Sequence, residues 1–242
     1  MGRASKPEAR LRLLGVLGGM SWTSTEIYYR LLNAGVAARL GGLHSARLLV
    51  HSVDFEPIAV RQHAGDWAGT AEILGEAARG LAAAGAEGVL LATNTMHKVA
   101  DEVERAAGLP LLHIADATAA AVRSAGLDRV GFLGTAYTME DSFLLDRLAG
   151  GGVQTVVPPA PARAEVHRII FDELVRDVVR EDSRATYRGI MADLVAAGAR
   201  GMILGCTEIG LLIGPDDTTV PVFDTTEIHA DAAVDWMVSP SR

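Results

Sequence analysis

Several chemically important residue types are scarce in this sequence. Among 242 residues there is one cysteine, Cys206, and there are two lysines, Lys6 and Lys98. A single cysteine excludes an internal disulfide and is typical of a reducing cytoplasm, where we expect this chain to work. Pyridoxal phosphate chemistry needs a Schiff-base lysine, and only Lys98 could serve, so we expect no such cofactor.

Long apolar runs and an excess of positive charge are also absent. No stretch of 18 or more apolar residues occurs, so the sequence predicts no transmembrane helix. A net charge of −8 without a basic stripe argues against a nucleic-acid partner. Residues 1–11 are polar and basic without an apolar segment, and they predict a disordered tail rather than a secretion signal.

Motifs of several common enzyme classes are missing as well. The short segments GVLGG (15–19) and GFLGT (131–135) lack the G-x-G-x-x-G pattern of dinucleotide binders. The chain has no P-loop and no G-x-S-x-G nucleophile elbow. No group of His, Asp, Glu or Cys residues has the spacing of metal ligands, so we expect no metal.

What the sequence does contain is a regular alternation of short apolar runs and longer amphipathic stretches. Strands that alternate with helices favour βαβ units and parallel sheets, so the fold class is α/β. We interpret eight runs as buried strands: 12–19, 46–53, 88–92, 110–114, 129–135, 153–158, 201–205 and 220–224.

The two halves of the chain repeat one another. AAGAEGVLLATN (83–94) and AAGARGMILGCT (196–207) share six of twelve positions at an offset of 113, which aligns Thr93 with Cys206. GVLGG is echoed by GFLGT, and LPLLH (109–113) by VPVFD (220–224), in the same order. Three matched landmarks indicate two copies of one α/β unit.

From this repeat we expect two pseudo-symmetric, doubly wound domains, each with a mostly parallel sheet flanked by helices. The first domain would comprise 1–113 plus 224–242, whose last segment is expected to be a helix that packs back on it. The second would comprise 114–223. The cleft between two such domains is the default place for an active site.

The repeated segments place polar residues where two strands end and helices are expected to begin. Thr93, Asn94 and Thr95 follow the strand 88–92, and Cys206 and Thr207 follow the strand 201–205. Free N–H groups at a helix start favour an anion such as a carboxylate. They also predict a pKa for the Cys206 thiol below its ordinary value of about 8.5.

Three segments carry a resemblance to a known family. LGGMSWTSTEIYYRLLN (17–33), LATNTMHK (91–98) and LGCTEIGLL (204–212) resemble the signatures of the aspartate/glutamate racemases, which need no pyridoxal phosphate. The resemblance extends over nearly the whole chain. It implies an isomerase that acts on a small amino acid, two pseudo-symmetric α/β domains with the site in their cleft, and a homodimer.

The resemblance also implies roles for individual residues. Cys206 would act on the L-enantiomer, with Glu208 supporting the thiol. The α-carboxylate would be held by side chains and backbone amides of Asn94, Thr95 and Thr207. Met20 and Ser21, in the first signature segment, would line the substrate site.

The chain departs from the family pattern at two positions. Thr93 stands where most members have a first catalytic cysteine, and a subgroup with the same TNTMHK motif carries threonine there. A hydroxyl is a poor base, so Thr93 would relay a proton or orient the substrate, and turnover would favour one direction. Glu165 stands where acidic-amino-acid racemases have a lysine, which predicts either pairing by Arg163 or Arg168 or a substrate with a non-acidic side chain.

Three functions therefore stay open at this point. The first is a cofactor-independent amino-acid racemase that uses Cys206 opposite Thr93. The second is a single-cysteine decarboxylase of malonate-type acids on the same fold, because one cysteine suits a single proton donor. The third is a non-catalytic amino-acid-binding relative. Cys206→Ser would separate the classes, because either enzyme should lose turnover whereas a binder should keep its ligand affinity.

Overall fold

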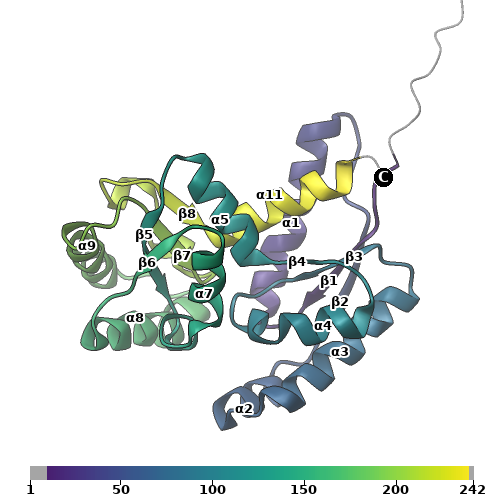
Figure 1. The fold of residues 1–242 in the computed structure, drawn as a ribbon, viewed down its shortest axis with the longest axis horizontal. Helices are drawn as coiled ribbons and strands as arrows, with labels where there is room; N and C mark the ends of the chain where they lie inside the picture. Colours follow the sequence, from purple (N-terminus) through teal and green to yellow (C-terminus); the bar gives the residue numbers. More distant parts are fainter. Residues whose placement is uncertain (1–9, 240–242) are drawn as a thin grey trace, which may run out of the picture. The chain divides into compact units, whose positions relative to one another are not determined.

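The computed structural model describes residues 10–239, which form two four-stranded sheets with flanking helices (Figure 1). Packing divides the chain into two compact units. Unit 1 comprises the described residues up to Leu90, Asp101–Leu112 and those from Ala230 onwards, whereas unit 2 comprises Leu91–Ala100 and His113–His229. This grouping follows packing neighbours, and the expected domain bounds stay a prediction. Residues 1–9 of the expected disordered tail lie outside the described residues.

The sheet of unit 1 has the strand order β2-β1-β3-β4, and the pairs β1–β2 and β3–β4 are parallel. Its strands are β1 (Leu14–Gly18), β2 (Leu48–Ser52), β3 (Gly88–Leu91) and β4 (Leu111–Leu112). The helices of this half are α1 (Trp22–Leu40), α2 (Glu56–Ala64), α3 (Trp67–Ala83) and α4 (Ala100–Ala107). A 3₁₀ segment, η1 (Thr95–Val99), precedes α4.

The sheet of unit 2 repeats this plan with the strand order β6-β5-β7-β8, all in parallel pairs. Its strands are β5 (Arg129–Gly134), β6 (Gln154–Val156), β7 (Met202–Gly205) and β8 (Val222–Asp224). Its helices are α5 (Ile114–Ser124), α6 (Ala136–Met139), α7 (Ser142–Gly150), α8 (Ala160–Asp172), α9 (Glu181–Ala196) and α10 (Ile209–Leu212), with 3₁₀ segments η2 (Leu174–Arg176) and η3 (Pro215–Asp217). The last helix, α11 (Thr225–Val238), begins in unit 2 and ends in unit 1.

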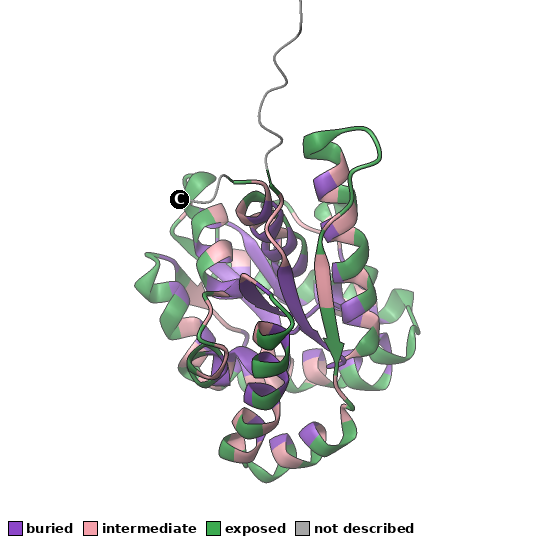
Figure 2. Ribbon diagram, turned by 90° about the vertical axis from the view of Figure 1, so that its right-hand side faces the viewer, coloured by how far each residue is buried: buried purple, intermediate pink, exposed green. Residues whose placement is uncertain are grey.

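The eight predicted strands are confirmed, but their predicted burial is wrong for the edge strands. The central strands β1, β3 and β7 are buried at every residue, whereas the edge strand β2 is half-buried to exposed throughout. An edge strand has a neighbour on one side only and is less completely covered. Figure 2 shows this contrast, with buried central strands and exposed helix faces.

The turn between β1 and α1 depends on a glycine and a capping serine. Gly19 has a φ of 95°, and a Cβ there would overlap the backbone of Val53, so no other residue type fits without strain. Ser21 then caps α1, because its side chain accepts a hydrogen bond from the Ser24 N–H at 3.2 Å. These two residues determine where the helix begins, at Trp22 directly after its cap.

The repeated landmarks LPLLH and VPVFD each end in a residue that caps the following helix. His113 ends the first segment and caps α5, because its Nδ1 accepts a hydrogen bond from the Ala115 N–H at 3.1 Å. Asp224 ends the second and caps α11 by accepting from the N–H groups of Thr226 (2.8 Å) and Glu227 (3.2 Å). Each strand end therefore starts the following helix with its own last side chain.

The end of α11 packs within unit 1. The Arg39 guanidinium of α1 pairs with both Asp231 and Asp235 at 2.7 Å, and a Cβ at Gly35 would lie 2.8 Å from the Val234 side chain. Gly35 thus allows the two helices a close approach. No helix within residues 10–239 is long and apolar enough to cross a membrane.

Candidate active site

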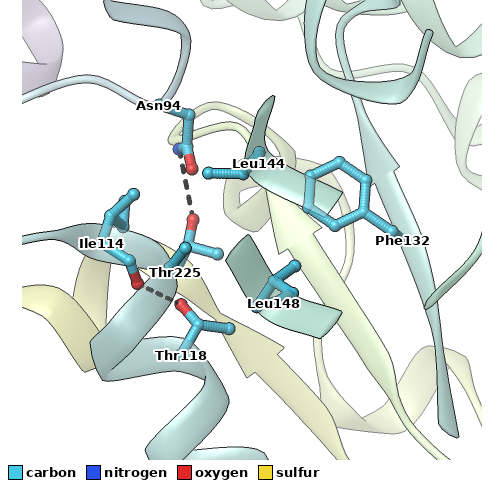
Figure 3. A pocket seen from close by; sticks show the side chains of 8 residues that line it. Asn94, Ile114, Thr118, Phe132, Leu144, Leu148 and Thr225 are labelled. Atoms are coloured by element: carbon cyan, nitrogen blue, oxygen red, sulfur yellow. Dashed lines mark hydrogen bonds between the residues drawn. The ribbon is translucent and has the colours of Figure 1, made fainter. Parts of the chain in front are cut away.

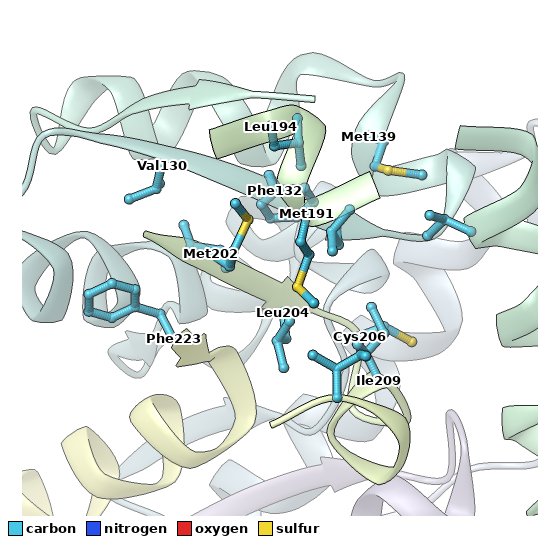
Figure 4. Close-up of a cluster of buried hydrophobic side chains, with 14 of the residues drawn as sticks. Val130, Phe132, Met139, Met191, Leu194, Met202, Leu204, Cys206, Ile209 and Phe223 are labelled. Atoms are coloured by element: carbon cyan, nitrogen blue, oxygen red, sulfur yellow. The ribbon is translucent and has the colours of Figure 1, made fainter. Parts of the chain in front are cut away.

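Cys206 lies at the carboxyl end of the central strand β7, at the border of the unit 2 core. Figure 4 shows its side chain beside Leu204 and Ile209 at the edge of the cluster that contains Phe132 and Met191. The residue is 9% exposed, so the sulfur is nearly removed from water. In open parallel sheets, the carboxyl ends of the strands are where ligands bind.

The Cys206 thiol donates a hydrogen bond to the Glu208 carboxylate, with 2.9 Å between Sγ and Oε2. The Thr207 hydroxyl donates to the same oxygen at 2.5 Å. Glu208 is itself buried, with 8% of its surface exposed. Two consecutive side chains therefore converge on one carboxylate oxygen of the residue that follows them.

The predicted lowering of the Cys206 pKa is wrong. Burial, followed by the negative charge of Glu208, raises the pKa of the thiol well above its ordinary value. The expectation relied on a helix that begins at Cys206, but α10 is four residues long and starts at Ile209. Its dipole is too small to offset desolvation beside a carboxylate. The resting thiol is consequently protonated at neutral pH.

Asn94 is joined to β7 by a chain of two hydrogen bonds. Its Nδ2 donates to the Thr225 Oγ1 at 3.2 Å, and the Thr225 hydroxyl donates to the Leu204 carbonyl at 2.8 Å (Figure 3). Because a carbonyl can only accept, the hydroxyl proton of Thr225 is used there, and Asn94 must present an N–H. The orientation of the amide is therefore determined by the network.

This orientation leaves the Asn94 Oδ1 without a donor. The atom is buried and has no hydrogen-bond partner among the described residues, although the residue is only 6% exposed. Such an unsatisfied buried acceptor is costly unless a ligand or a water supplies an N–H or O–H. The narrow space on one side of Asn94 is lined mainly by apolar side chains such as Ile114, Phe132 and Leu148.

Thr93 belongs to the same compact unit as Cys206, because the segment Leu91–Ala100 packs with unit 2. It is 8% exposed, and its carbonyl accepts a hydrogen bond from the His97 ring at 2.8 Å. Thr95 is half-buried and begins η1, a 3₁₀ turn rather than the expected α-helix, which starts only at Ala100.

The remaining predicted site residues lie on other elements. Met20 is buried and Ser21 caps α1 in unit 1, where its Oγ is also 2.5 Å from the Thr23 hydroxyl. Glu165 lies on α8 of unit 2 with 39% of its side chain exposed. Arg168 donates to both of its oxygens, at 3.0 and 2.7 Å, and lowers the pKa of the Glu165 carboxyl.

Both arginines that could replace the missing lysine are already engaged. Besides Glu165, Arg168 pairs with the buried Glu173 at 2.9 Å. Arg163 pairs with Glu140 at 3.2 Å and donates to the Pro158 carbonyl at 2.9 Å. The predicted alternative in which one of them serves a substrate carboxylate would require these contacts to break.

Sequence reasoning did not select His97 or Thr225 as functional residues. Lys98 pairs with Asp141, and its neighbour His97 is buried. The LPLLH and VPVFD repeat was a usable signal for Thr225, because it marks the strand end directly before it. Within residues 10–239, no group of three or more His, Cys, Asp or Glu side chains is arranged to hold a metal ion.

Comparison with known proteins supports one family throughout. A family model described as Asp/Glu/hydantoin racemase matches residues 17–233. A structure from Yersinia pestis, described as a candidate Asp/Glu racemase, is 50% identical with a TM-score of 0.91, covering 95% of this chain and 100% of the other. An aspartate racemase homologue from Pyrococcus horikoshii OT3 is 32% identical with a TM-score of 0.83, at 95% and 100% coverage. A glutamate racemase from Pseudomonas putida is 36% identical over 152 residues, which is 58% of this chain and 54% of that enzyme.

Proposed function

Because the chain belongs to the Asp/Glu/hydantoin racemase family, we propose that it is a cofactor-independent amino-acid racemase that moves the α-proton of its substrate at Cys206. The observation that carries this proposal is the 2.9 Å hydrogen bond from the Cys206 thiol to Glu208. A cysteine that only fills the core needs no such partner. A thiol that donates to a carboxylate has a route by which its proton can leave and return.

The proposed proton transfer balances in two steps. Glu208 accepts the thiol proton, and the resulting thiolate removes the α-proton of the L-enantiomer. The electron pair of the broken C–H bond stays on the α-carbon, and the proton ends on sulfur. A proton delivered to the opposite face of that carbon completes the inversion. That proton comes from a water on the Thr93 side, and the proton held by Glu208 returns to solvent, where it neutralises the hydroxide that the water leaves.

In this proposal Thr93 determines how a proton reaches the opposite face of the α-carbon. Its hydroxyl is too weak an acid to hold a negative charge near neutral pH, so it relays a proton from water instead of acting as a base. Cys206, whose thiol is protonated at rest, returns a proton readily to its own face. Exchange at the Cys206 face is therefore proposed to be faster than full inversion.

The Asn94 side chain is suited to bind an amino acid. The unsatisfied Oδ1 needs a donor, and the α-ammonium group of an amino acid carries three N–H donors. The Thr207 hydroxyl proton is used on Glu208, so its oxygen offers lone pairs to the same ammonium. In this proposal Asn94, Thr95 and Thr207 surround the α-carbon substituents, with the carboxylate bound by backbone N–H groups.

The side-chain preference is proposed to be non-acidic. In unit 2, Arg163 and Arg168 are committed to Glu140, Glu165 and Glu173. A substrate with a second carboxylate would have to displace one of these partners, at a cost in affinity. A neutral or cationic side chain avoids that competition.

A second candidate function is favoured by one observation, the raised pKa of the thiol. A thiol that stays protonated suits a single proton donation to a carbanion, as required after decarboxylation of a malonate-type acid. In that reaction the C–C bond to one carboxylate breaks, carbon dioxide leaves with no net redox change, and Cys206 protonates the remaining carbon. This function needs no group on the Thr93 side.

The proposal is tested by NMR in D₂O with L- and D-amino acids that carry acidic, neutral and basic side chains. We expect loss of the α-proton signal from an L-amino acid, with slower appearance of the D-form, and loss of both in Cys206→Ser. The serine variant keeps the size of the side chain and a donor for Glu208, so it serves as a folding control by its urea midpoint.

Other outcomes discriminate among the functions. Exchange that persists in Cys206→Ser would contradict a role for the thiol. Absence of α-proton exchange with every amino acid tested, together with carbon dioxide release from an arylmalonate, would favour the decarboxylase. Amino-acid binding without exchange, retained in Cys206→Ser, would indicate a binding protein.

A further inference from the structure

The buried histidine His97 contacts the candidate site with both its side chain and its main chain. Its Nδ1 lies 2.8 Å from the Thr93 carbonyl, and its backbone N–H donates to the Asn94 carbonyl at 3.2 Å. The side chain is 3% exposed, so both contacts are shielded from water. One residue thus holds two successive carbonyls of the turn that carries Thr93 and Asn94.

The tautomer of His97 follows from its other ring contact. The Ile114 N–H, at the first residue of α5, lies 3.2 Å from the Nε2. A backbone N–H can only donate, so Nε2 carries no proton and Nδ1 carries it. The ring therefore donates to the Thr93 carbonyl while it accepts from Ile114, and it links the turn to the start of α5.

The surroundings of the ring keep it in this neutral form. The His113 ring is 4.5 Å away and the fully buried His229 ring is 5.6 Å away. A second proton on His97 would face the Ile114 N–H across the Nε2 contact and would be repelled. The contact to the Thr93 carbonyl consequently persists across the neutral pH range.

Holding the carbonyls also directs the amides of the same peptide groups. In a trans peptide the C=O and the next N–H point in opposite directions, and neither of these two peptides is cis. The N–H groups of Asn94 and Thr95 therefore both point away from His97. Neither donates a hydrogen bond to any acceptor in residues 10–239. The unsatisfied Asn94 Oδ1 belongs to the same turn.

We propose that His97 is a positioning residue, which orients the N–H groups of Asn94 and Thr95 toward the α-carboxylate of the amino-acid substrate. The inference rests on the proposed function, since it needs an amino acid in the site. The ring does not touch the substrate in this arrangement. It acts through the peptide groups, whose orientation it determines before the substrate arrives.

Two variants separate the two ring contacts. In His97→Asn, the side-chain amide places Nδ2 where the Nδ1 stands, so the donor to Thr93 is kept and the acceptor for Ile114 is lost. In His97→Gln, the terminal amide reaches the Nε2 position, so the acceptor is kept and the donor to Thr93 is lost. Each variant loses one hydrogen bond of similar strength, and we expect similar losses in urea midpoint.

The two variants should differ in substrate binding. For L-alanine, L-aspartate or L-lysine, whichever the wild-type protein exchanges, we expect KM to rise about tenfold in His97→Gln and less than about threefold in His97→Asn. Equal rises in the two variants, or a larger rise in His97→Asn, would overturn the inference. A residue with a merely structural role would affect KM in proportion to the lost stability.

A second measurement uses the wild-type protein and tests the proposal even when a variant fails to fold. In ¹⁵N NMR of the wild-type protein, the His97 ring should show a protonated Nδ1 and an unprotonated Nε2, and the reverse would overturn the inference. Addition of the same three amino acids should shift the amide resonances of Asn94 and Thr95. Amide shifts without α-proton exchange would contradict the racemase function and support the role of His97. Exchange without amide shifts would support the racemase function and contradict the role of His97.

Discussion

The Cys206 thiol donates to the carboxylate of Glu208, two residues further along the chain, across 2.9 Å. In the proposed mechanism this contact places the proton-transfer group and its acceptor in one segment, so their geometry does not depend on a distant element. It also means that the same carboxylate has two opposing effects. Its charge raises the pKa of the thiol, and its oxygen gives the thiol proton a place to go.

Neutralising Glu208 should lower the pKa of Cys206. In Glu208→Gln the burial stays but the adjacent negative charge is lost, so more thiolate forms at a given pH. Because Cys206 is the only cysteine, thiolate absorbance near 240 nm reports on it once the Cys206→Ser titration is subtracted as the blank for the four tyrosines. We expect the titration to move to lower pH, while Glu208→Asp, which keeps the charge, should move it less. An unchanged titration in Glu208→Gln would contradict the assigned cause.

Substitutions at Thr93 should change full inversion more than exchange at the Cys206 face. Thr93→Val keeps the shape and removes the hydroxyl, so appearance of the D-form should fall by about 10²-fold or more if the hydroxyl relays a proton. Thr93→Cys supplies a second thiol and should increase inversion. Both rates come from one NMR experiment in D₂O. Equal inversion in Thr93→Val and wild type would show that Thr93 only fills space.

Stability should decrease on mild acidification because of His97. Burial, together with His113 and His229, lowers the pKa of His97 well below its ordinary value, so the unfolded chain binds this proton more readily than the folded chain. The contribution of neutral His97 to the free energy of unfolding is complete above about pH 6.5. It is lost as the pH falls from there toward the pKa of His97 in the folded state.

Urea unfolding at pH 7.5 and 5.5 measures this loss. In His97→Gln the group no longer titrates, so the difference between the two pH values should shrink. The Asp224 carboxyl, whose pKa is raised by burial, acts with the opposite sign, but it is present in both proteins and cancels in the comparison. The same pH difference in both proteins would contradict the prediction.

The glycine before Cys206 should be intolerant of a side chain. A Cβ at Gly205 would overlap the Phe132 ring in the core of unit 2, so Gly205→Ala should lower the free energy of unfolding by about 1–3 kcal/mol. Gly189 on α9 is exposed, and a Cβ there meets nothing within 4 Å. Gly189→Ala is the matched control and should raise the free energy of unfolding by about 0.5–1 kcal/mol through helix propensity.

Thermal or urea unfolding of the two alanine variants decides this prediction. A small effect of Gly205→Ala would mean that Phe132 moves aside easily. In that case the end of β7 is less tightly packed than its burial indicates, and the position of Cys206 is correspondingly less constrained. A clear loss in Gly205→Ala beside a small gain in Gly189→Ala would support the packing described for this strand end.

The sequence by itself determined the plan of the fold. Periodic apolar runs located all eight strands, and the internal repeat related Thr93 to Cys206. This succeeded because strand position depends on local hydrophobic pattern, and because β7 and β3 are short, uniformly apolar segments followed directly by polar residues.

Only the tertiary structure decided the electrostatics of the site. The Cys206 pKa is raised because the sulfur is buried beside a buried Glu208, and burial depends on which elements cover a strand end. Asn94 meets Thr225 across 131 residues of sequence, and His97 meets Ile114 across 17. Such contacts join segments whose approach no local pattern encodes, because it depends on how the strands and helices pack against one another.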